Sequence, residues 1–152
     1  MNRTDKEECI IGYITLLSNK LTQFGDNILP DITFKQWFLL IMIAKMENRE
    51  KSLNSISEFV GTSRQNVKKM LTPLEAKEYV KICKSEFDSR ALNVELTEKS
   101  YRYFNENADN AAQVTNKLFE CFSIDEIESL MSNLGKLINS LSLYGGNNKP
   151  EF

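Results

Sequence analysis

Apolar residues recur with helical spacing at both ends of this chain. Near the start they alternate steps of four and three positions, at Ile10, Ile14, Leu17, Leu21, Phe24 and Ile28. Near the end the same spacing joins Ile127, Met131, Leu134, Ile138 and Leu141. Such narrow heptad seams pack against other helices. We therefore expect a long first helix from about Lys6 to Ile28, fraying at Gly25 and Pro30, and a two-fold dimer built from both ends.

The segment after the first helix predicts a buried helix. Thr33 and Gln36 have the spacing of a capping box, and Ile32 and Trp37 that of a hydrophobic staple. The run from Trp37 to Ala44 is apolar on nearly every side, which is typical of a central helix. Residues 46–52 are expected to form a polar loop.

Residues 53–74 have the pattern of a helix-turn-helix. Leu53, Ile56 and Val60 form one apolar face, and Gly61 suits a helix end that needs positive φ. Thr62 and Gln65 have the spacing of a second capping box, which predicts an immediate restart. The second helix has a buried stripe at Val67, Met70, Leu71 and Leu74. A short glycine-containing turn between two helices is typical of this motif.

Two alternating segments follow, at residues 79–84 and 91–96, with a polar tip at 85–90 between them. Alternation of this kind predicts a hairpin, which after a helix-turn-helix is a wing. Asp88 lies two residues before Arg90, close enough to orient the guanidinium. An oriented arginine at the tip suits a narrow minor groove, although an ordinary surface ion pair is the alternative.

The second helix carries polar residues opposite its buried stripe. These are Gln65, Lys68, Lys69 and Thr72, with Ser63, Arg64 and Asn66 near the helix start. Such side chains can pair with base edges and phosphates in a major groove. A plain solvated helix face is the alternative.

Charge is distributed unevenly along the chain. The 152 residues, enough for one domain, have a net charge of −2, yet residues 61–90 hold seven Lys or Arg and four acids. A locally basic surface on an acidic body favours site-specific over indiscriminate DNA binding.

Composition argues against several other classes. The sequence has no histidine, no glycine-rich phosphate loop and no apolar run of membrane-spanning length. Residues 1–8 are polar and charged, unlike a signal peptide. Cys9, Cys83 and Cys121 are odd in number and far apart, as in a reduced cytoplasmic protein. We therefore expect no enzyme, no cofactor, no metal site and no membrane partner.

The order of these motifs resembles the MarR (multiple antibiotic resistance regulator) family of winged-helix transcription factors. The resemblance rests on residues 32–37, on Gly61 to Val67 and above all on Asp88 to Lys99, with its Asp-x-Arg wing tip and Leu-Thr-Glu-Lys helix start. It implies a mainly α fold with a small β-hairpin wing in one domain over residues 1–152. Dimerisation helices would occupy 6–30 and 97–144, the winged helix-turn-helix 33–96 and a tail 145–152.

Two residues depart from simple expectations. Pro73 falls inside the second helix, where it removes a backbone hydrogen bond, so we expect a kink or an early stop near residues 69–72. Glu78 stands before Tyr79, where the family usually has glycine. The end of the second helix therefore departs from the family's pattern.

These features predict a homodimeric repressor that binds a pseudo-palindromic site on double-stranded DNA. A protein-assembly module without DNA binding is the alternative. The resemblance also implies a small aromatic or phenolic effector, for which Phe34, Trp37 and Tyr101 could line a pocket. Cys9, with Tyr13 one turn later, resembles an oxidant sensor, but a plain buried cysteine is the commoner case. Cys83 and Cys121 are expected to be structural.

Overall fold

A computed structural model describes residues 1–46, 50–84 and 92–144. These residues form six helices and one antiparallel hairpin: α1 (Arg3–Ile28), α2 (Phe34–Lys45), α3 (Leu53–Val60), α4 (Arg64–Ala76), β1 (Val80–Lys84), β2 (Leu92–Leu96), α5 (Glu98–Phe119) and α6 (Ile124–Tyr144). The predicted fold class, mainly α with a small hairpin, is confirmed. Within the part of the chain described, no helix has both the length and the apolar character to cross a membrane.

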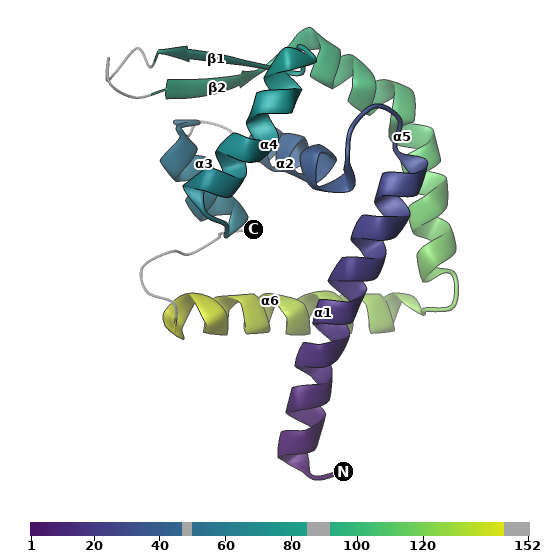
Figure 1. Ribbon diagram of the computed structural model, residues 1–152. Helices are drawn as coiled ribbons and strands as arrows, with labels where there is room; N and C mark the ends of the chain where they lie inside the picture. Colours follow the sequence, from purple (N-terminus) through teal and green to yellow (C-terminus); the bar gives the residue numbers. More distant parts are fainter. Residues whose placement is uncertain (47–49, 85–91, 145–152) are drawn as a thin grey trace.

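The elements from α2 to β2, here called the winged module, surround the main apolar core. Helix α2 lies at the centre, in contact with α3, α4 and β2 (Figure 1). Fully buried side chains come from all of these elements, among them Leu39, Ile43, Ile56, Leu71, Leu74 and Val94. The capping box of Thr33 and Gln36 starts α2 as predicted, with both reciprocal hydrogen bonds present. The predictions of a central α2 and of the α4 stripe are confirmed.

The hairpin has a simple register, with Val80 opposite Leu96 and Lys84 opposite Leu92. The stretch before α3 contributes to it, because Ser52 pairs with Asn93 and the Val94 amide donates to the Lys51 carbonyl at 2.9 Å. Ser52 also caps α3 by accepting from the Ser55 amide. Residues 46–52 were predicted to form a polar loop; residues 47–49 lie outside the described part of the chain, and the end of the segment adds a bridge to the hairpin.

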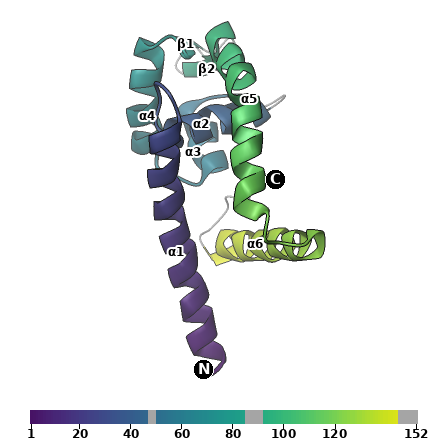
Figure 2. The same cartoon turned by 90° about the vertical axis from the view of Figure 1, so that its right-hand side faces the viewer.

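Helices α1, α5 and α6, here called the frame, extend away from the winged module. Figures 1 and 2 show α1 and α5 leaving it together, with α6 beyond the far end of α5. Only Gly25 is buried in α1, and no residue is buried in α6. Most residues of the heptad seams predicted at both ends are exposed in the single chain, for example Leu17 at 54% and Met131 at 69%; Ile14, Leu21, Ile127 and Ile138 are half-buried.

The joint between α1 and α2 depends on a close approach at Gly25. A Cβ atom at this position would lie 2.7 Å from Phe34 Cβ and closer still to the Phe34 ring. Asp26 on the next position accepts a hydrogen bond from the Phe34 amide, which fixes the start of α2. The predicted end of the helix at Ile28 is confirmed, but the expectation of fraying at Gly25 is wrong, because this glycine is buried where α2 packs.

Two helix starts differ in how they are capped. Ser123 and Glu126 form the reciprocal bonds of a capping box before α6. Thr97 stands at the N-cap position of α5, but its hydroxyl makes no capping bond. It donates instead toward the carbonyls of Glu78 and Tyr79, at 2.6 and 3.1 Å. The start of α5 is therefore attached to the chain that leaves α4.

Candidate nucleic-acid interface

Helix α4 presents the predicted recognition residues on one exposed side. Arg64, Gln65, Asn66, Lys68 and Lys69 are all exposed, while Val67, Leu71 and Leu74 are fully buried beneath them. This division follows from helical geometry, since residues three and four apart share a face. The structure thus brings together the α4 residues that the sequence singles out, and it leaves their polar ends free of the apolar core.

The start of α4 lies one residue later than the sequence suggests. Ser63, not Thr62, is the N-cap, and its hydroxyl accepts from the Asn66 amide at 3.2 Å. Thr62 accepts instead from the Asn66 side-chain amide, also at 3.2 Å. The predicted Thr62–Gln65 capping box is therefore wrong, because the turn at Gly61 places Ser63 at the last extended residue. As a result Gln65 is free of any capping role, while Asn66 and Ser63 are each engaged locally.

Pro73 does not end the helix. Helix α4 runs from Arg64 to Ala76 with the proline inside it, so an early stop near residues 69–72 is wrong, and the kink expected as its alternative stays a prediction. The Thr72 hydroxyl donates to the Lys68 carbonyl at 2.9 Å, one residue before the carbonyl that loses its partner to proline. Buried Leu71 and Leu74 on both sides of Pro73 hold this turn against the core. Packing has overridden the local preference.

The wing tip lies outside the described residues, and with it Asp88 and Arg90. Both strands that carry the tip are described, and β1 adds two lysines that belong to the basic region 61–90 but not to the predicted DNA contacts. Lys81 and Lys84 on β1 are both exposed. Lys81 alternates with Val80 and Ile82, which was the signal that could have identified it, whereas Lys84 is exposed at the end of the strand. No cluster of metal-ligating side chains occurs among the described residues.

Glu78 adopts the backbone conformation usually reserved for glycine. Its φ is +62°, and the Tyr79 amide bonds the Leu74 carbonyl at 2.8 Å, as at many helix ends. Left-handed conformation costs a residue with a Cβ roughly 1–2 kcal/mol. Glu78 thus occupies a backbone position that suits glycine, at a cost in backbone strain.

Replacing Glu78 with glycine is expected to stabilise the protein. Relief of the left-handed strain outweighs the greater freedom of glycine in the unfolded chain, for a net gain of about 0.5–1 kcal/mol. Urea unfolding followed by circular dichroism measures it. Glu78→Ala keeps the Cβ atom and removes the charge, so it should show no comparable gain; an equal gain would assign the effect to charge.

The three cysteines occupy different surroundings. Cys9 and its neighbour Tyr13 are both exposed on α1, so the prediction of a plain buried Cys9 does not describe the single chain. Cys121 is exposed as well. Cys83 is half-buried on β1, where partial burial and a contact with Glu95 raise the pKa of its thiol. A raised pKa makes Cys83 a poor nucleophile.

A cavity of about 450 Å³ lies between α1, α2 and α5. Phe34 and Trp37 line it, as predicted, with ring centroids 5.5 Å apart. Tyr101 does not: it is 51% exposed and packs edge-on against Phe104. Tyr101 lies on α5 about one helical turn nearer to the winged module than the cavity does. The polar lining residues Asn107, Asn110 and Thr115 were missed, since nothing in a single sequence marks them.

The chain is similar to known regulators in sequence and in structure. No family model matches it. The transcriptional repressor MprA of Escherichia coli K12 is 26% identical over 102 residues, which is 67% of this chain and 58% of that protein. The match therefore spans less than two thirds of the curated relative's length.

Two solved structures superpose over most of the chain. A MarR/EmrR family transcriptional regulator from Acinetobacter sp. ADP1 has a TM-score of 0.77 and 23% identity, covering 89% of this chain and 96% of its own. A complex of S. aureus MepR with DNA has a TM-score of 0.73 and 23% identity, covering 86% and 96%. At such identities the likeness establishes the fold. The resemblance found in the sequence is confirmed, and the chain has the winged-helix fold of the MarR-family transcriptional regulators.

Proposed function

We propose that this protein is a homodimeric, sequence-specific DNA-binding regulator that represses transcription. The observation that carries the proposal is the exposed side of α4, where Gln65, Lys68 and Lys69 extend from a helix fixed by its buried stripe. A helix of this kind fits a major groove, with its polar residues toward base edges and phosphates. Arg90, oriented by Asp88, would enter the flanking minor groove. The MprA repressor and the MepR–DNA complex support the same function.

The proposed dimer follows from the exposed seams of the frame. Monomeric proteins rarely expose large contiguous apolar patches, yet α6 buries no residue and α1 only one. A second copy that covers these helices would place two α4 helices on one face of DNA. Successive major grooves lie about 34 Å apart on such a face, which matches a pseudo-palindromic site.

Selection from a random duplex library, followed by titration at rising salt, tests the proposal. We expect enrichment of a two-fold symmetric sequence and a steep fall of log affinity with log salt concentration, because phosphate contacts release counterions. Lys69→Gln, present twice in a dimer, is expected to reduce that slope by about 2. Arg90→Ala should weaken binding as well.

The control is Lys136→Gln, which removes an exposed lysine of α6 whose ammonium donates to Asn133 at 3.4 Å. This change should leave the slope as it is. If no sequence is enriched and no salt dependence is seen, the protein-assembly alternative stands. If Lys136→Gln lowers the slope as much as Lys69→Gln, the contact surface is not α4.

The cavity between α1, α2 and α5 is the site that we assign to an effector. Its described lining residues are apolar or neutral, including Phe34, Trp37, Asn107 and Thr115. A charged ligand would lose its hydration there without a partner charge. A small neutral aromatic compound or phenol therefore suits the cavity better than a carboxylate. By filling space where frame and winged module meet, it would favour a conformation with a different spacing of the two α4 helices.

The selected DNA complex also tests this assignment. 4-Ethylphenol should release the DNA, benzoate of similar size should not, and Ala111→Phe, which fills the cavity, should abolish the response. Release by both compounds, or an unchanged response in the variant, would contradict the assignment. Release of DNA through oxidation of Cys9 stays a separate prediction. Its test is whether peroxide still releases DNA from the Cys9→Ser variant.

A further inference from the structure

The winged module is joined to the frame by few elements. Helix α1 packs against α2, and α5 contacts β2, while most of α1 and α5 extends away from the module (Figures 1 and 2). Between α1 and α2 runs a short loop, residues 29–33. Within it Asp31 has a φ of +69°, a left-handed conformation that few residues other than glycine, asparagine and aspartate adopt.

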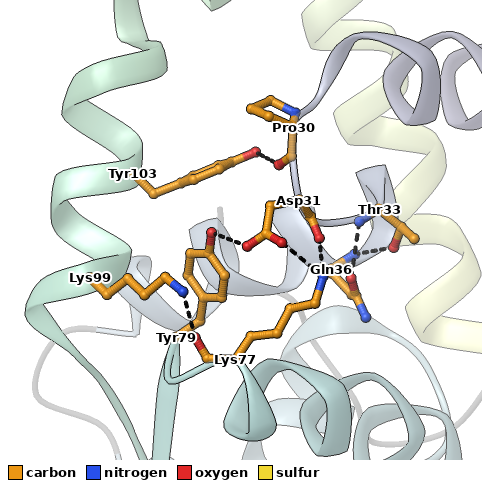
Figure 3. A network of polar contacts seen from close by, with 8 residues as sticks. All are labelled: Pro30, Asp31, Thr33, Gln36, Lys77, Tyr79, Lys99 and Tyr103. Atoms are coloured by element: carbon orange, nitrogen blue, oxygen red, sulfur yellow. Dashed lines mark hydrogen bonds and ion pairs between the residues drawn. The ribbon is translucent and has the colours of Figure 1, made fainter.

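Three acceptor atoms of Asp31 receive donors from the end of α4. The Tyr79 hydroxyl donates to Asp31 Oδ2 at 2.8 Å, and Lys77 Nζ lies 3.0 Å from Oδ1 (Figure 3). Lys77 also donates to the main-chain carbonyl of Asp31. Lys77 is the C-cap of α4, and Tyr79 leads directly into β1. Asp31 therefore contacts both residues of the junction between the recognition helix and the wing, Lys77 and Tyr79.

Helix α5 contacts both the loop after α1 and the end of α4. The Tyr103 hydroxyl donates to the Pro30 carbonyl at 2.8 Å, and its ring meets that of Tyr79 edge-on at 5.4 Å. Lys99 Nζ lies 4.5 Å above the Tyr79 ring and donates to the Lys77 carbonyl at 2.8 Å (Figure 3). The loop after α1, the end of α4 and the first turns of α5 are thus fixed to one another by polar contacts.

The contacts of Asp31 with Tyr79 and Lys77 favour the ionised form of its carboxyl group. The hydrogen bond from Tyr79, and then that from Lys77, lower the pKa of the Asp31 carboxyl. Burial, and then the bond to Asp31, raise the pKa of the Tyr79 phenol, which keeps its proton in place for donation. Because the carboxyl pKa is lowered on folding, the contacts are complete above the usual Asp range of about 4 and are lost as pH falls below it.

We propose that Asp31 is a positioning residue that sets the angle of α4 on the α1–α5 frame, and hence the spacing of the two recognition helices in a DNA-bound dimer. The spacing part of this inference rests on the proposed function. Asp31 and Lys77 are both nearly half exposed, at 46% and 42%. An exposed pair of this kind contributes little to stability. Loss of the Asp31–Lys77 pair should therefore change the angle of α4 and leave the fold intact.

The first test measures geometry without DNA. Spin labels are attached through Lys20→Cys on α1 and Lys68→Cys on α4, in a chain with Cys9, Cys83 and Cys121 changed to serine. Dilution with unlabelled protein restricts the measurement to pairs within one chain. We expect a narrow distance distribution that becomes at least twice as broad in Asp31→Asn and in Tyr79→Phe. Asn tolerates positive φ, so Asp31→Asn removes the charge without new backbone strain.

The second test measures DNA binding on the duplex selected above. Asp31→Asn should weaken binding to the two-half-site duplex about tenfold, relax the preference for one half-site spacing, and leave binding to a single half-site unchanged. The control, Glu7→Gln, breaks the exposed Arg3–Glu7 ion pair on α1 and should change neither readout. Equal losses on single and double half-sites would overturn the role in spacing.

The two tests separate the inference from the proposed function. If the wild-type protein binds no DNA, the proposed function fails, while the label distances still decide whether Asp31 sets the angle. If the distances in Asp31→Asn and Tyr79→Phe match the parent chain, the inference is wrong even when DNA binding is confirmed. Unfolding midpoints in urea, expected to be nearly equal, exclude general destabilisation as the cause.

Discussion

Leu17→Lys combined with Leu134→Lys is expected to give a folded monomer that binds its DNA 100-fold to 1,000-fold more weakly. Leu17 on α1 and Leu134 on α6 belong to the two apolar seams and are 54% and 38% exposed in the single chain. In a dimer, each lysine would be buried without a partner charge, at high cost. A monomer binds only one half-site of the DNA. It loses the gain in affinity, about 10²–10⁴-fold, that the linked second half-site supplies.

Sedimentation velocity and duplex titration measure the two parts of this prediction. Because both positions are exposed in the protomer, circular dichroism should show an unchanged helix content. The matched control is Asn19→Lys with Ser129→Lys, which adds the same charges on the opposite sides of the same helices. This control should stay dimeric and bind normally. A seam variant that remains dimeric would place the dimer interface elsewhere on the molecule.

Gly25→Ala is expected to destabilise the protein by about 2 kcal/mol, although alanine is the better helix former. The added methyl group would overlap the stem of the Phe34 side chain, which cannot swing away because Asp26 holds the Phe34 amide at 2.6 Å. Overpacking of a fixed contact typically costs 1–3 kcal/mol, roughly, and outweighs a gain in helix propensity of about 1 kcal/mol. Equilibrium unfolding in urea gives the difference directly.

Gly12→Ala provides the control in the same helix. Nothing lies within 4 Å of a Cβ atom at Gly12, which is exposed on the side of α1 opposite Ile10. Here the propensity gain should appear unopposed, as a stabilisation of about 0.5–1 kcal/mol. Two identical substitutions in one helix are thus expected to have opposite signs. Stabilisation by both would mean that α1 and α2 can separate without loss.

The elements that could be predicted from the sequence are those specified by local pattern. The stripe of Val67, Leu71 and Leu74 and the alternation of the two strands depend on periods of a few residues, and the structure has both. Local patterns were less reliable at single positions. Thr62 and Ser63 are chemically equivalent caps, and only the turn at Gly61 decides between them.

Contacts between distant segments could not be predicted in this way. Asp31 meets Lys77 and Tyr79 across 46 and 48 positions, and no spacing in the chain relates them. Gly25 looked like a helix end because its packing partner on α2 is not visible from sequence alone. The continuation of α4 through Pro73 also depends on tertiary packing, since the local preference opposes it.

The start of α5 has no side-chain capping bond, because the side chains of its first turn donate to the chain at the end of α4. Thr97, Lys99 and Ser100 donate to the consecutive carbonyls of residues 77–79. A helix of 22 residues is about 33 Å long. If α5 pivots by about 5° at its far end, where α6 begins, its first turn and the attached end of α4 are carried about 3 Å. In the proposed dimer, a small rotation at the subunit interface would thereby become a larger displacement of α4 relative to its groove on DNA.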